Sequence, residues 1–219
     1  QNYRKMLFIT DARSGAVLHR ESLVLNGSVG VQVNGVATPG SKAATCTAPV
    51  VTGMPYTQVN IGGTALYTNA SGALTHTYTG TAAVTVAPVL EGLYFSVADL
   101  KTAVQSVASG SVANGTTGTF QFPSITNEYL QSQVNTYVCA NQERDFVLSV
   151  SPSYPTICTQ MGMVINNGVS GTCNAYYDGS SINFFSSGGG CNNTGFSSVV
   201  YHEYGHHMVS CAGSGQGEY

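Results

Sequence analysis

Charge is the scarcest feature of this sequence. Only 8% of its 219 residues are Asp, Glu, Lys or Arg, against roughly 25% in an average globular protein. With seven basic and ten acidic residues and a net charge of −3, the chain has no basic stripe that could follow a phosphate backbone. We therefore expect no nucleic-acid partner. No apolar run approaches the ~18 residues that cross a membrane, so we expect no membrane partner either.

Closely spaced Cys-x-x-Cys pairs are also absent, which argues against a thiolate zinc ribbon or a redox motif. Six widely spaced cysteines in a Lys-poor chain indicate disulfide bonds and an oxidising compartment, and hence a secreted, extracellular protein. We favour a Cys173–Cys191 pair, because the segment between these residues looks like a folded-back strand and loop. Buried free thiols are the alternative. The six are Cys46, Cys139, Cys158, Cys173, Cys191 and Cys211.

The amino terminus lacks an initiator methionine and the core of a signal peptide. Its one apolar stretch, Met6–Ile9, is four residues long, whereas the apolar region of a signal peptide has about 7–15 residues. We expect the chain to be a piece of a longer precursor whose targeting signals lie upstream.

In place of charge the sequence has many Gly, Ser, Thr, Asn and Tyr residues, a composition typical of β-rich proteins. The opening predicts a hairpin, with strands over Met6–Thr10 and Ala16–Leu25 and turn residues between them. From Val29 to about Val97, short strands alternate with turn signals every eight to twelve residues. One example is the pair of strands on either side of the turn Asn69–Gly72. This spacing predicts a small sandwich or barrel.

Two helices are predicted in the second half of the chain. Thr126 fits an N-cap, Glu128 favours the first turn, and apolar residues at helical spacing continue to about Asp145. A last helix begins near Ser197, another suitable N-cap, and continues to Val209.

The last predicted helix contains the pattern His-Glu-x-x-His, at His202, Glu203 and His206. Residues four apart lie one turn above each other, with Cβ atoms about 5–6 Å apart, so two imidazoles can converge on one ion at about 2.0–2.1 Å. Glu203 lies about 100° round the helix, where it can reach a metal-bound water and accept its proton. The pattern predicts a catalytic Zn²⁺ with His202 and His206 as ligands and Glu203 as general base. Two packed or surface histidines are the alternative.

The third zinc ligand is not evident. The longer pattern that adds a third histidine is absent, because Val209 and Ala212 occupy its Gly and His positions. His207 lies about 140° from His202 and is interpreted as a supporting or surface residue. A carboxylate from a following helix is the other common ligand, and Glu218 is the only acidic residue downstream. Two imidazoles alone predict weak zinc binding and little activity for these 219 residues.

Phe196–Met208 resembles the zinc helix of secreted peptidases of the thermolysin and fungalysin type, the Glu-zincins. Asn174, Ala175, Tyr176 and Tyr177 resemble the edge strand that lies along substrate in that family. The resemblance implies that the Asn174 side chain and the Ala175 carbonyl bind the substrate main chain, while the two tyrosines line the cleft. An exposed strand edge can accept an extended peptide in this way; an ordinary aromatic edge strand is the alternative.

Other segments resemble the same family. Asn135–Val147 resembles the preceding helix, and Phe8–Leu18 resembles the closing hairpin of the propeptide, which makes the chain's own propeptide an expected partner. In the family, a Gly-Glu-Gly-x-x-Asp-like element supplies the glutamate ligand. No such element is visible before Tyr219. Either Glu218 begins it or the glutamate lies beyond the end, and we prefer the second interpretation.

The resulting fold prediction is α+β: the N-terminal half of a zincin-like catalytic domain, with an edge β-sheet and the His-Glu-x-x-His helix, preceded by a small all-β module. The predicted segments are a propeptide-like hairpin, a sandwich-like module, a linker, and the first part of the catalytic domain, at residues 1–28, 29–98, 99–125 and 126–219.

The predicted function is a secreted zinc-dependent endopeptidase that acts on peptide or protein substrates and is made as a zymogen. Two alternatives stay open. A non-catalytic β-rich adhesion or binding protein is favoured by the long β region and by four Asn-x-Ser/Thr sequons, at Asn26, Asn69, Asn114 and Asn192. An inactive metallopeptidase relative would share the same motif.

Overall fold

The structure is a computed structural model that describes residues 6–22, 27–38, 48–123, 127–154, 157, 159–168 and 171–213. Within these ranges the chain forms fourteen strands and two helices, and strands hold 43% of residues against 21% in helices. The helices are α1 (Glu128–Val150) and α2 (Ser197–Cys211).

The larger sheet has eight strands in the order β13-β14-β12-β9-β8-β5-β6, with β10 paired to β8. β12 runs parallel to both of its neighbours, and the other pairs are antiparallel. Strand β13 therefore lies at one edge of this sheet. The strands are β5 (Thr57–Ile61), β6 (Thr64–Tyr67), β8 (Val84–Gly92), β9 (Phe95–Asp99), β10 (Gly110–Val112), β12 (Met161–Asn167), β13 (Ala175–Tyr177) and β14 (Ser181–Phe185).

A four-stranded sheet packs against the larger one through a shared apolar core. Its long strand β3 has alternating buried residues, among them Val29, Val31 and Val33, which join the cluster that also contains Val86 and Leu90 of β8. This period-two pattern is what a strand with one covered face requires. The strands are β3 (Gly27–Ala37), β4 (Val50–Gly53), β7 (Ala73–Tyr78) and β11 (Thr117–Gln121).

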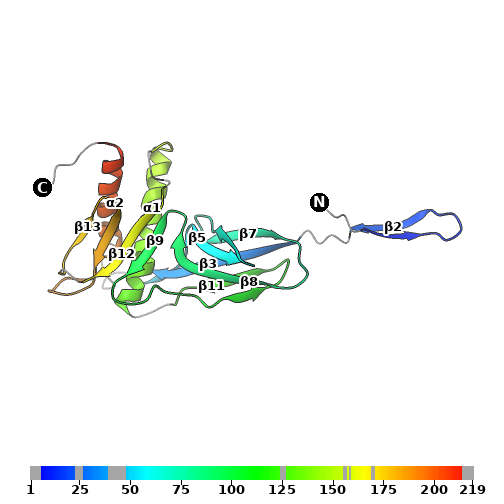
Figure 1. The fold of residues 1–219 in the computed structure, drawn as a ribbon, viewed down its shortest axis with the longest axis horizontal. Helices are drawn as coiled ribbons and strands as arrows, with labels where there is room; N and C mark the ends of the chain where they lie inside the picture. Colours follow the sequence, from blue (N-terminus) through cyan, green and yellow to red (C-terminus); the bar gives the residue numbers. More distant parts are fainter. Residues whose placement is uncertain are drawn as a thin grey trace.

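The predicted opening hairpin is confirmed. β1 (Met6–Thr10) pairs antiparallel with β2 (Val17–Ser22). The turn is closed by the Asp11 carboxylate, which accepts hydrogen bonds from two backbone N–H groups, and by Gly15 at a φ of 72°. The hairpin stands apart from the rest of the chain (Figure 1), so apolar side chains such as Phe8, 52% exposed, face solvent.

The α+β fold prediction was wrong. The chain is mainly β-sheet, and its eight-stranded sheet takes strands from residues 57 to 185, so a small β module does not stand in front of a half catalytic domain. Local alternation identifies a strand but not its distant partner, and β9 pairs with β12, with Phe95 opposite Met161. The division into four segments stays a prediction.

Helix α1 fixes the two sheets to each other, because it contacts β3 of the smaller sheet and β9 and β12 of the larger one. Asn127 is its N-cap, and the side-chain oxygen accepts the Tyr129 N–H at 2.9 Å. The predicted N-cap, Thr126, lies outside the described residues. The helix continues past the predicted end to Val150 and stops before Pro152, as expected because a residue before proline disfavours helical backbone.

Candidate active site

Helix α2 presents two different faces. Val200 and Tyr204, four residues apart, are buried, and the Tyr204 ring meets the Phe95 ring of β9 edge-on at 5.4 Å. On another face His202 is exposed and His206 is half-buried. Ser197 is the first helical residue rather than the predicted N-cap, which is Phe196 and has no side-chain cap bond. Apolar packing therefore orients the helix and leaves the histidine face open.

The two imidazoles of this face point at the same place. The Nε2 atoms of His202 and His206 lie 3.0 Å apart, and the rings are nearly perpendicular, with centroids 4.7 Å apart. Two nitrogens bound to one tetrahedral ion at about 2.0–2.1 Å would lie about 3.3 Å apart. The observed distance also suits one N–H···N hydrogen bond. The pair can thus donate two lone pairs to one metal with little movement.

The Glu203 side chain lies between the helix and strand β13. Glu203 is only 5% exposed. Burial raises the pKa of the carboxyl group above its usual value, while the charges of His202 and His206 and a hydrogen bond from the Tyr177 N–H act to lower it. The carboxyl group therefore lies within electrostatic range of both imidazoles and accepts a hydrogen bond from the edge strand.

Strand β13 pairs with β14 along one of its two backbone edges. The Asn174 carbonyl accepts the Phe185 N–H at 3.3 Å, and the Asp178 N–H donates to the Ser181 carbonyl at 3.1 Å, so residues 174 and 178 face β14. Backbone groups alternate along an antiparallel ladder. The N–H and C=O of Ala175 and Tyr177 consequently face the outer edge of the sheet.

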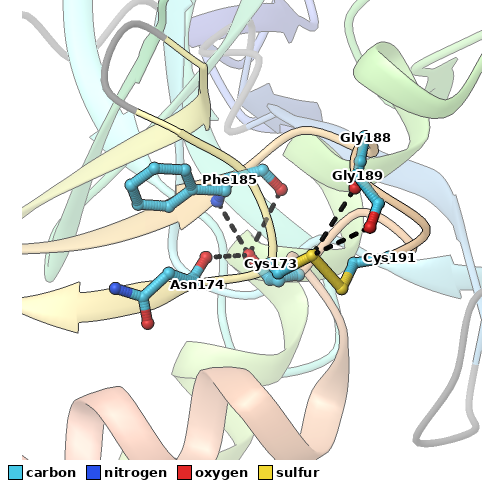
Figure 2. The surroundings of a disulfide bond; sticks show 7 residues. Cys173, Asn174, Phe185, Gly188, Gly189 and Cys191 are labelled. Carbon is cyan, nitrogen blue, oxygen red and sulfur yellow. Dashed lines mark hydrogen bonds between the residues drawn. A yellow bond between two sulfur atoms is a disulfide. The ribbon is translucent and has the colours of Figure 1, made fainter.

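The start of β13 is anchored by a disulfide bond, as predicted. Cys173 and Cys191 are joined, and the Thr194 hydroxyl donates to the Asn174 carbonyl at 3.0 Å. Figure 2 shows the Asn174 side-chain amide projecting away from the disulfide. Cys139 and Cys211 are free within the described residues, while Cys46 and Cys158 lie outside them.

The two tyrosines of β13 point to different surroundings. Tyr176 is 36% exposed and packs beside Phe185, with ring centroids 5.9 Å apart. The Tyr177 hydroxyl donates to the Gly179 carbonyl at 2.9 Å and lies 3.2 Å from Nδ1 of His207. Only Tyr176 therefore presents its ring openly to solvent.

His207 lies inside this arrangement rather than on the surface. Its ring stacks on Tyr204, with centroids 5.6 Å apart, and meets the Tyr177 ring edge-on at 5.5 Å. The Cys211 thiol lies 3.5 Å from its Nε2 atom. Burial lowers the pKa of this imidazole below its usual value. Sequence spacing alone left the position of His207 open, and only the packing of β13 on α2 decides it.

The described residues contain no group of three His, Cys, Asp or Glu side chains that could hold a metal ion together. The donor set on α2 is two imidazoles with an adjacent carboxylate, which suits the borderline character of zinc but does not complete a site. Glu218, one of the two candidates for the third zinc ligand, lies outside the described residues.

A separate cavity of about 260 Å³ lies where α1, the start of α2 and the β3–β4 pair meet. It is lined by Cys139, Gln142 and Tyr201 among others and by none of the predicted site residues. Burial raises the pKa of the Cys139 thiol to about 12, so this thiol is protonated at neutral pH. The cavity therefore offers no reactive thiolate.

None of the described helices is both long and apolar enough to cross a bilayer. The comparisons with family models and with curated proteins give no match to this chain.

Proposed function

We propose that this protein is a secreted zinc-dependent endopeptidase, with His202 and His206 as zinc ligands and Glu203 as general base. The observation that supports it most is the 3.0 Å separation of the two Nε2 atoms beside a buried carboxyl group. The intervening Glu203 accepts a hydrogen bond from the neighbouring strand β13, so the carboxyl group and the two imidazoles belong to one arrangement.

The chemistry is hydrolysis of a peptide bond by water. Bound zinc supplies a positive charge that polarises the scissile carbonyl and lowers the pKa of water. Glu203 accepts the proton of the attacking water as the C–O bond forms. It then delivers that proton to the amine nitrogen as the C–N bond breaks. Its partly desolvated position beside two imidazoles suits a group that must first take a proton and then release it.

Substrate binding is assigned to β13, at Asn174, Ala175, Tyr176 and Tyr177. The outward-facing N–H and C=O of Ala175 and the C=O of Tyr177 can pair with an extended peptide, which adds a strand to the sheet. The Tyr177 N–H already contacts Glu203. A peptide on this edge would therefore pass next to the general base.

The propeptide-like role of the hairpin β1–β2 and the extracellular location belong to the same proposal. The Cys173–Cys191 disulfide is compatible with an oxidising compartment. An inactive relative that binds metal without hydrolysis is the second candidate, favoured by the fact that the described residues supply only two ligands.

The test compares two glutamates on neighbouring helices in the full-length, zinc-loaded protein. Glu203→Gln keeps the shape of the side chain but removes the base, so hydrolysis of a fluorogenic peptide should fall by about 10²–10⁴-fold. Zinc content should stay at the wild-type value. Glu143→Gln on α1 is the matched control, since Glu143 is also partly buried, and it should keep activity within about twofold.

Zinc-loaded wild-type protein that cleaves no peptide would favour the inactive relative. Equal activity of Glu203→Gln and wild type would refute the assigned role of Glu203.

A further inference from the structure

His207 connects the helix that carries the imidazoles to the edge strand β13. Three side chains contact its ring at the distances given above: Tyr177 from β13, and Tyr204 and Cys211 from α2. Phe95 of β9 lies behind Tyr204. The edge strand is thereby linked through His207 to the buried core of the sheet.

The hydrogen bonds around this ring fix its orientation. The Tyr177 hydroxyl has one proton, and it donates that proton to the Gly179 carbonyl. Its oxygen must then accept from His207, which places a proton on Nδ1. In the neutral imidazole Nε2 is then an acceptor, and the Cys211 thiol lies 3.5 Å away, where it can donate. The bonds form one consistent chain from Cys211 to Gly179.

Tyr177 is consequently held at two points. Its backbone N–H binds the Glu203 carboxylate, and its hydroxyl binds His207. β13 is only three residues long, and no strand among the described residues pairs with its outer edge. Without these two bonds, β14 and the disulfide would hold the strand from one side alone.

We propose that His207 is a positioning residue, which holds Tyr177 so that the free backbone groups of β13 stay beside Glu203. The inference rests on the proposed function, since the purpose of the arrangement is to present a peptide to the general base. It also revises the expected part of Tyr177, whose ring contacts His207 and so serves the strand's position. His207 does not bind metal in this account.

The activity test uses the full-length, zinc-loaded protein and two substrate lengths. His207→Ala should raise KM for a six-residue peptide by about fivefold, as expected for the loss of one hydrogen bond. kcat should change less than twofold. A blocked dipeptide, too short to pair along β13, should show no change in KM. His207→Asn places an amide N–H near the position of Nδ1 and should restore KM to within about twofold of wild type.

A second measurement does not depend on activity. Amide hydrogen exchange of Tyr176 and Tyr177 in the 219-residue chain should become about fivefold faster in His207→Ala and in Tyr177→Phe, and not in His207→Asn. His76→Ala, on the distant strand β7, is the matched histidine control and should leave this exchange unchanged.

The outcomes separate the two proposals. If wild type cleaves no peptide but exchange at β13 responds as described, the peptidase proposal fails and the positioning of the strand stands. If peptides are cleaved but His207→Ala and His207→Asn behave alike, or kcat falls while KM stays constant, the positioning role is refuted.

Discussion

Helices α1 and α2 pack against each other and contact the same sheet (Figure 1). They differ in how many of their residues are buried. Eleven of the 23 residues of α1 are buried, including several polar ones, against four of the 15 in α2. α1 touches both sheets, whereas α2 keeps its imidazole face open. The difference indicates that stability is concentrated in α1, which allows α2 to leave its two imidazoles unburied.

The largest effect on stability is therefore expected in α1, at Tyr137. This side chain is fully buried, and its hydroxyl donates to the Pro55 carbonyl at 2.8 Å. Tyr137→Ala should lower the free energy of unfolding by about 3–5 kcal/mol, as for other large aromatic truncations. Urea denaturation followed by circular dichroism measures this. Phe146→Ala on the same helix, at a 65% exposed position, should change it by at most about 0.5 kcal/mol.

If Tyr137→Ala and Phe146→Ala lowered the free energy of unfolding equally, burial along α1 would not determine its contribution to stability.

A smaller effect distinguishes two glycines, one facing α1 and one within α2. A Cβ atom on Gly195 would lie 2.7 Å from the Thr136 Oγ1 atom of α1, so Gly195→Ala should cost about 1–3 kcal/mol. A Cβ on Gly205 meets nothing within 4 Å among the described residues. Gly205→Ala should therefore stabilise the helix by about 0.5–1 kcal/mol through helix propensity.

Thermal unfolding shows whether each of the two alanine variants is less or more stable than wild type. A destabilised Gly205→Ala would mean that the face of α2 around residue 205 is covered in solution. This would contradict the contrast between a buried α1 and an open α2.

The sequence predicted the local features of the fold well. The hairpin at Met6, the turn at Asn69, the disulfide Cys173–Cys191 and the helix starting at Ser197 are each specified by residues close in the chain. Asn69, for example, accepts the N–H groups of Ser71 and Ala73 with its own side chain. Such turn chemistry can be read directly from a sequence.

The pairing of distant strands could not be predicted in the same way. The parallel β9–β12 pair depends on which strands share the core beneath α1. The period-two pattern of a strand does not show which other strand is its neighbour. The fold class was misjudged for this reason. The length of α1 was also underestimated, since the helix runs to Val150, five residues past its predicted end.

In the candidate site, too, the local features could be predicted from the sequence and the contacts between distant residues could not. His202, Glu203 and His206 follow from spacing on one helix, whereas the contacts of His207 with Tyr177 and of Tyr177 with Glu203 join residues about 30 positions apart. A sequence pattern can place donors on one face of a helix. It cannot show which strand lies against that face.

The central claim is that one turn of α2 holds a metal, and zinc titration of the full-length protein tests it most directly. We expect about one zinc per wild-type chain, with affinity lowered at least about a hundredfold by His202→Ala or His206→Ala. His76→Ala should bind like wild type. A wild-type protein that binds no zinc, or equal affinity in all four proteins, would contradict the claim.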